Sequence, residues 1–337
     1  MDLGFMEMMR TAAVIIDESL KPQPGEDIVV VSDSRVHEYQ GMQPLTQALM
    51  AAFAERGLDP TMIVYEGRQR SNPSIPNAAA KAIESADIVV AENSVLILQS
   101  QVFERLMRNR SNRVMLLPSG INVSWSPDEI YRMMPRTKEE LTEMSELMNR
   151  VGDKLKGNHK IHFTAPNGTD AYVDIIHFPM YGENGIAIHD GRCDKKGMSA
   201  IIPGGSIVCM TAPGTITGKI VLDAEASFAS GLLHDAATVY FKDGLITSIE
   251  GDGETARLVR DTLSSPENKD MQGNAMPEYG MGFNKRAQLN GNSSEGESLY
   301  GCVHIGIGAL RGHFDAILPN ATVEVDGELV LKDGEYL

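Results

Sequence analysis

The first 150 residues alternate between short, mainly apolar runs and longer segments in which apolar residues recur with a helical period. The apolar runs cover 27–33, 61–67, 87–93 and 113–120, and the helix-period segments around them cover 6–20, 44–57, 77–86 and 98–107. Strands that are apolar on both faces and separated by helices are typical of a parallel sheet with helices on both sides. The pattern therefore predicts an α/β domain with a mainly parallel sheet.

The pattern changes after two helix-period segments with charged faces, at 126–134 and 137–157. From residue 159 onward most of the chain reads as strands, several of them joined by Asp-Gly turns. Asp-Gly between two strands is a signal for a hairpin. We therefore predict an α/β domain over residues 1–157 and a β-rich, antiparallel, barrel-like domain over residues 158–337.

Charge and composition exclude several kinds of partner. The formal net charge is −16, so nucleic acid and anionic membrane surfaces would repel the chain. No run approaches the roughly 18 apolar residues of a membrane span, and the N-terminus lacks the basic start of a signal peptide. The three cysteines form no C-x-x-C pair and suit a reducing compartment. We expect a cytoplasmic protein whose partner is a small-molecule substrate.

The α/β domain lacks the signature of a dinucleotide site. Its first predicted strand continues without a G-x-G-x-x-G, and the chain contains no G-x-x-x-x-G-K-[ST]. Without such a loop, phosphate groups lack a cradle of backbone N–H groups. Arg35, His37 and Tyr39 follow this strand, and they are secondary candidates for lining a pocket because ligands bind beyond the carboxyl ends of parallel strands.

A stretch near the C-terminus, GCVHIGIGALRGHFDAILP (301–319), places polar groups inside strand-like sequence. In an extended segment His313 and Asp315 leave the same face, and His304 is a second imidazole nearby. An imidazole and a carboxylate on one face can hold Zn²⁺, Mn²⁺ or Fe²⁺. They can equally form a histidine oriented by its carboxylate.

A second motif lies upstream, where Glu278 begins the run E-x-G-x-G-x-N. Its glycines allow the backbone to pass close to a bound group. Together with the C-terminal stretch, it supplies two carboxylates and two imidazoles. A 2-His-1-carboxylate metal site and its close variants need such a set of donors.

The order E-x-G-x-G-x-N, then G-x-V-H-I-x-I-G, then H-x-D, followed by a terminal hairpin, resembles the aminopeptidase T family of metalloaminopeptidases and their relatives, the 2,5-dihydroxypyridine 5,6-dioxygenases. The resemblance covers most of the chain. It implies an N-terminal α/β domain, a β-rich metal-binding domain and a homodimer. It also places four residues at metal-ligand positions, namely Glu278, His304, His313 and Asp315.

Departures from the peptidase pattern bear on the reaction. Ser206 stands where the peptidases have a glutamate for a second metal, and the segment between His304 and His313 is too short for their tyrosine-bearing loop. The dioxygenases use one Fe(II) and have a histidine at the position of Glu278. Since a two-metal hydrolase needs both cations, the resemblance favours a single-metal enzyme.

We therefore expect an Fe(II)-dependent dioxygenase that opens the ring of a small hydroxylated aromatic or heteroaromatic compound. The alternative is a metal-dependent aminopeptidase or amide hydrolase using Zn²⁺, Co²⁺ or Mn²⁺. His304 would be a fourth ligand or would move a proton. Arg286, beside Asn284, would orient an anionic substituent of the substrate.

The remaining polar motifs read as structural. His189-Asp190 and His234-Asp235 fit turns between strands. The polar, glycine-rich stretch from NKDMQGNAMPEYG to NGNSSEGE (268–297) predicts loops around another group.

Overall fold

The apolar runs of the N-terminal region form a parallel sheet in the order β2-β1-β3-β4-β8. The computed structural model describes residues 3–35, 42–67, 74–94, 100–117, 129, 132–181, 184–229, 231–268, 271, 273–310 and 312–337. The strands are β1 (Ile28–Asp33), β2 (Thr61–Tyr65), β3 (Ile88–Glu92), β4 (Arg113–Leu116) and β8 (Ser199–Ile201). The helices are α1 (Leu3–Val14), the π-helix η1 (Ile15–Leu20), α2 (Met42–Glu55), α3 (Asn77–Ser85) and α4 (Gln101–Asn109).

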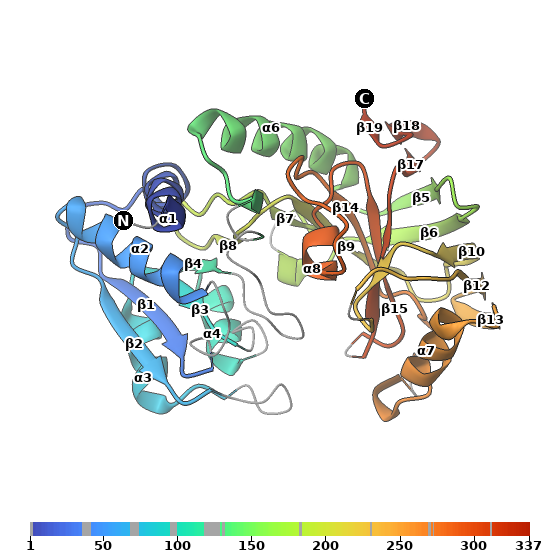
Figure 1. Cartoon of the computed structure of the whole chain (residues 1–337), viewed down its shortest axis with the longest axis horizontal. Coiled ribbons are helices and arrows are strands. Elements are labelled where there is room, and N and C mark those ends of the chain that lie inside the picture. Colours follow the sequence, from blue (N-terminus) through green and yellow to red (C-terminus); the bar gives the residue numbers. More distant parts are fainter. Residues whose placement is uncertain are drawn as a thin grey trace. The chain divides into compact units, whose positions relative to one another are not determined.

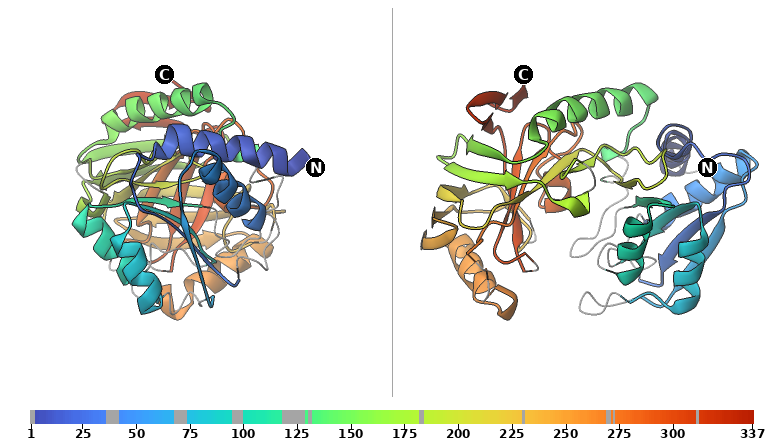
Figure 2. Two further views of the ribbon diagram at one scale, coloured as in Figure 1. Left: turned by 90° about the vertical axis from the view of Figure 1, so that its left-hand side faces the viewer. Right: turned by 180° about the vertical axis from the view of Figure 1, so that it is seen from behind.

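Helices cover both faces of this sheet, as the sequence predicts. Strands β1, β3 and β4 are buried along their whole length. Helices α3 and α4 pack on one face through a cluster that includes Ile83 and Leu106, and α1 and α2 lie on the other (Figures 1 and 2). Burial on both faces is the reason why these strands are continuously apolar.

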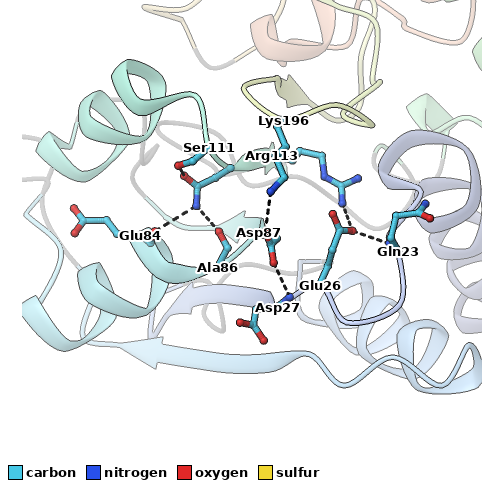
Figure 3. Close-up of polar contacts among 10 residues, drawn as sticks. Gln23, Glu26, Asp27, Glu84, Ala86, Asp87, Ser111, Arg113 and Lys196 are labelled. Atoms are coloured by element: carbon cyan, nitrogen blue, oxygen red, sulfur yellow. Dashed lines mark hydrogen bonds and ion pairs between the residues drawn. The ribbon is translucent and has the colours of Figure 1, made fainter.

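Strand β8 is an addition that the sequence pattern did not predict. It comes from the region assigned to the β-rich domain, yet it pairs with β4 in parallel. Figure 3 shows polar contacts that hold this part of the sheet: Lys196, just before β8, lies 3.4 Å from the Asp87 carboxylate, and Arg113 on β4 forms an ion pair with Glu26. A three-residue strand is too short to show a hydrophobic period.

The second half of the chain forms one large, mainly antiparallel sheet. Its strands are β5 (His159–Thr164), β6 (Asp170–Ile176), β7 (Ala187–His189), β9 (Ser206–Thr211), β10 (Thr217–Leu222), β11 (Glu225–Ala226), β12 (Ala237–Lys242), β13 (Leu245–Glu250), β14 (Glu278–Gly282), β15 (Val303–Ile307), β16 (Phe314–Leu318), β17 (Thr322–Val325), β18 (Glu328–Lys332) and β19 (Glu335–Tyr336). The helices of this half are α6 (Lys138–Leu155), α7 (Glu254–Leu263), the short α8 (Ser293–Gly296), and the 3-10 turns η4 (Pro179–Tyr181) and η5 (Pro266–Asn268).

The main path of this sheet runs β11-β16-β15-β14-β9-β6-β5-β17-β18-β19. Strand β6 pairs with β5 along one edge, and shares its other edge between β10 and β9. Strands β12 and β13 continue from β10, and α7 packs on them. The α/β plus β fold class is therefore confirmed. Among the described residues, no helix is long and apolar enough to cross a membrane.

The chain divides into two compact units, one made of residues 1–145 and 189–204 and the other of residues 146–188 and 205–337. The chain thus passes between the units three times, whereas the sequence pattern predicts one boundary after residue 157. The difference has two causes: α6 is shared between the units, and the segment that carries β8 returns to the parallel sheet.

Candidate metal centre

The candidate centre lies on three adjacent strands of the large sheet, β14, β15 and β16 (Figure 1 labels the first two). Glu278 on β14 pairs with Gly306 on β15, and Gly306 pairs with Asp315 on β16. Residues opposite each other in antiparallel strands point to the same face. Glu278 and Asp315 therefore flank a glycine on one face of the sheet.

The glycine of the E-x-G motif makes room for His304. Gly280 pairs with His304, and a Cβ on Gly280 would lie 2.1 Å from both Cε1 and Nε2 of the imidazole. The ring therefore lies across the backbone of β14, and its side chain is completely buried. The sequence predicts that the glycines of this motif face a bound group; Gly280 instead faces a histidine of the chain itself.

Gly306 does the same for His313. A Cβ on Gly306 would lie 2.7 Å from Cδ2 of His313 and 3.0 Å from Cβ of Glu278. The gap left by this glycine is therefore filled by the imidazole that precedes β16. His313 can lie between Glu278 and Asp315 only because Gly306, which separates these two residues in the sheet, has no side chain.

Three of the four predicted ligands come together. Glu278, His313 and Asp315 each offer one ligand atom, and these atoms lie within 4.8 Å of one another. His313 Nε2 is 3.5 Å from Asp315 Oδ1 and 3.8 Å from Glu278 Oε2. His304 lies beside this group, with Nε2 3.9 Å from Glu278 Oε1. An imidazole and two carboxylates fit a divalent cation of the first transition row.

Both histidines use Nδ1 for a backbone contact. Nδ1 of His313 lies 3.0 Å from the carbonyl oxygen of Leu310, and Nδ1 of His304 lies 3.1 Å from the carbonyl oxygen of Glu297. A carbonyl can only accept, so each Nδ1 carries the proton and each Nε2 presents its lone pair. Metal-binding histidines are commonly oriented in this way.

Asp315 is held through its backbone by the neighbouring edge of the sheet. Its N–H donates to the Ser227 hydroxyl at 2.8 Å, and its carbonyl oxygen accepts from the N–H of Ser227 at 2.8 Å. Ser227 directly follows β11, the edge strand that pairs with β16. The carboxylate thus projects from a strand that is fixed on both sides.

The electrostatics of the centre favour a cation. Burial, and after it the negative charge of Asp315, raise the pKa of Glu278, His313 acts in the opposite direction, and the net pKa is about 7. Two carboxylates close together in a poorly solvated place repel each other unless a proton or a cation lies between them. The arrangement therefore needs positive charge.

Three further residues at the centre were not named by the sequence analysis. The pKa of Glu297, just after α8, is raised by burial and by the charges of Asp315 and Glu278. Met210 lies on β9 and pairs with Glu278 on β14. The Tyr181 hydroxyl donates to the Met210 sulfur at 3.6 Å. Only Glu297 had a sequence signal, because it ends the run NGNSSEGE that was expected to surround another group.

Ser206 lies away from the candidate metal ligands. Ser206 pairs with Gly282, at the opposite end of β14 from Glu278, and β9 contains no carboxylate. Strand β9 therefore supplies no carboxylate ligand for a second metal. Arg286 lies in the turn after β14, where its N–H donates to Oδ1 of Asn284, so the length of the strand separates its backbone from Glu278.

The other polar candidates have structural contacts. Asp190 accepts from the Ser145 hydroxyl and from the N–H of Arg192. Asp235 accepts from the N–H groups of the first two residues of α7, so it caps that helix. Arg35 closes a turn with Asp33, whereas His37 and Tyr39 lie outside the described residues.

Comparison with known proteins confirms the resemblance. The family model described as NicX, 2,5-dihydroxypyridine 5,6-dioxygenase, matches residues 18–337. The structure of 2,5-dihydroxypyridine dioxygenase from Pseudomonas putida KT2440 has a TM-score of 0.78 at 18% identity, covering 99% of this chain and 97% of that one. AmpT from Thermus thermophilus has a TM-score of 0.57 at 12% identity, covering 98% of this chain and 99% of that one. A comparison with curated proteins finds no match.

Proposed function

Since the chain belongs to the 2,5-dihydroxypyridine 5,6-dioxygenase family, we propose that it is a mononuclear non-haem Fe(II) dioxygenase that opens the ring of a small hydroxylated aromatic compound such as 2,5-dihydroxypyridine. One observation supports this most: ligand atoms of Glu278, His313 and Asp315 gather within 4.8 Å. The imidazole of His313 is already oriented with its Nε2 toward both carboxylates.

In this proposal Glu278, His313 and Asp315 hold the iron. Bound Fe(II) would supply the redox chemistry that lets dioxygen react with the ring. The protein supplies a fixed set of donors on three strands that hydrogen bonds hold in register. Such preorganisation lowers the cost of ordering the ligands when the metal binds.

His304 and Arg286 have roles toward the substrate in this proposal. Nε2 of His304, buried 3.9 Å from Glu278, is the atom that would accept a proton at the centre. Nδ1 keeps its proton and donates it in a hydrogen bond to the carbonyl oxygen of Glu297, so Nε2 is the accepting atom. Arg286 would pair with an anionic substituent only if the substrate extends along β14, because the strand separates its backbone from Glu278.

A metal-dependent amide hydrolase is the second candidate, and the donor set is the observation that favours it. The three gathered residues include one histidine and two carboxylates, not two histidines and one carboxylate. Carboxylate-rich sites also suit cations that activate water without changing oxidation state. The absence of a carboxylate from β9 weighs against a second metal and supports the dioxygenase.

The test is a reaction that is assembled without oxygen and started by adding O₂. The protein is loaded with Fe(II), mixed with 2,5-dihydroxypyridine and related rings, and then exposed to O₂ while oxygen uptake and ring absorbance are recorded. We expect oxygen uptake stoichiometric with ring loss and about one divalent ion per chain, with both abolished in His313→Ala. His234→Ala removes an exposed imidazole outside the centre and should leave both unchanged.

Release of amino acids from small peptides without oxygen, with Zn²⁺, Co²⁺ or Mn²⁺ bound, would establish the hydrolase instead. We also propose a homodimer, on the resemblance alone, and a location in the cytoplasm, on the pattern of the three cysteines. Light scattering that gives a monomeric mass would remove the dimer from this proposal.

A further inference from the structure

A buried asparagine outside the candidate centre holds the loop that carries His313. Asn268 ends η5, the short turn that follows α7, and its side chain is 2% exposed. The loop lies between β15 and β16, and its described residues are 308–310, 312 and 313. The two segments are more than 40 residues apart in the sequence.

The Asn268 amide bonds to both ends of this loop. Its Oδ1 accepts from the N–H of Ala309 at 2.6 Å, and its Nδ2 donates to the carbonyl oxygen of Gly312 at 2.7 Å. The same Nδ2 donates to the carbonyl oxygen of Thr262 in α7 at 3.0 Å. One side chain therefore ties the loop to the end of a helix.

The loop in turn sets the direction of His313. The N–H of His313 donates to the carbonyl oxygen of Ala309 at 2.7 Å, and its Nδ1 lies 3.0 Å from the carbonyl oxygen of Leu310. Gly308 allows the close packing, because a Cβ there would lie 2.4 Å from Asn268 Oδ1 and 3.0 Å from Cα of His313. The backbone groups that orient the imidazole thus belong to the loop that Asn268 holds.

We infer that Asn268 is a positioning residue for the metal centre: it fixes the loop from which His313 presents Nε2. This inference rests on the proposed function in so far as His313 is a metal ligand. Partners that orient a ligand from outside the coordination shell typically change metal affinity by 10- to 100-fold when they are removed.

The experiment is a titration with Co²⁺, whose visible absorption reports both affinity and ligand geometry. Asn268→Ala should bind Co²⁺ at least about tenfold more weakly than the wild type and give an altered Co²⁺ spectrum. Asn268→Asp retains the shape and the acceptor for Ala309 but places an oxygen against the Gly312 carbonyl, so it should also weaken binding. Circular dichroism confirms that each variant is folded, and Asn268→Asp provides the test if Asn268→Ala does not fold.

Asn112→Ala is the matched control. Asn112 is also a buried asparagine that donates to a backbone carbonyl, that of Ala86, but it belongs to the parallel-sheet unit. Its variant should lose thermal stability and retain the Co²⁺ affinity and spectrum. Wild-type affinity and spectrum in folded Asn268 variants would overturn the inference, whereas a wild type that binds no Co²⁺ would instead count against the proposed metal centre.

Discussion

At the scale of single residues, the centre depends on two glycines without side chains as much as on the side chains that could bind a metal. Gly280 and Gly306 lie opposite His304 and Glu278, and each leaves the space that an imidazole fills. The carboxylates alone are unfavourable, because burial and mutual repulsion raise the pKa of Glu278 to about 7. A cation removes both penalties.

Metal binding should depend on pH through Glu278. Below pH 7 its carboxyl holds a proton that a metal must displace, so affinity should fall by up to about tenfold for each pH unit below 7 and level off above it. Competition titrations at pH 6, 7 and 8 measure this. Glu278→Gln should bind more weakly and lose this part of the pH dependence. Equal affinity of the wild type at pH 6 and 8 would contradict the role of this carboxyl.

Gly280→Ala tests the space for His304. The added Cβ would lie 2.1 Å from the ring and 2.7 Å from the carbonyl oxygen of Ile207, so we expect a loss of about 1–3 kcal/mol in unfolding free energy. In the double variant with His304→Ala the ring is gone, and the loss should be smaller than the sum of the two single losses. Strictly additive losses in chemical denaturation would show that ring and glycine do not interact.

At the scale of elements, a buried charged residue in a short apolar strand can link several neighbouring elements. Arg113 begins β4 and is 2% exposed, yet its guanidinium bonds to the carbonyl oxygen of Leu20 at the end of η1 and to Glu26. Figure 3 shows the ion pair with Glu26. This side chain therefore links the π-helix, the following turn and the sheet.

Arg113→Met should destabilise the protein strongly. It retains the length of the side chain but removes the donor to the Leu20 carbonyl and the cation beside Glu26, which keeps only the N–H of Gln23, so we expect a loss of about 3 kcal/mol. The control is Arg105→Met, which breaks the more exposed ion pair with Glu84 and should cost less than about 1 kcal/mol. Similar unfolding free energies for the two variants would refute the structural role of Arg113.

At the scale of the whole molecule, stability depends on ionisable groups with opposite effects. Nδ1 of His189 is buried without a hydrogen-bond partner among the described residues, and burial lowers the pKa of this imidazole to about 4. Glu278 has a raised pKa, so its contribution to stability is present at low pH and is lost as pH rises toward 7. The two contributions partly cancel in the metal-free protein.

The contribution of His189 is isolated by comparing the wild type with His189→Phe. Between the unfolded pKa of 6.5 and the folded value of about 4, the unfolded wild-type chain binds the extra proton, so wild-type stability falls as the pH falls. The difference between wild-type and variant unfolding free energies should drop by up to about 3 kcal/mol from pH 7 to pH 4. Urea denaturation at several pH values measures it, and a constant difference would exclude a buried neutral imidazole.

The sequence by itself determined the features that repeat along the chain or act locally. Continuous apolar strands between helices predicted the parallel sheet, and Asp-Gly turns predicted the antiparallel half. Spacing alone placed His313 and Asp315 on one face, because side chains alternate along an extended chain. The motif order was sufficient for the family, which the match over residues 18–337 confirms.

Only the tertiary structure decided which distant residues meet. It brought Glu278, His313 and Asp315 together, and it placed Ser206 at the far end of β14. The roles of Gly280 and Gly306 depend on the pairing between strands, and strand register cannot be read from composition or period. For the same reason, the sequence did not show that β8, which lies in the predicted β-rich domain, pairs with the parallel sheet. Nor did it show that Asn268 bonds to a loop more than 40 residues away.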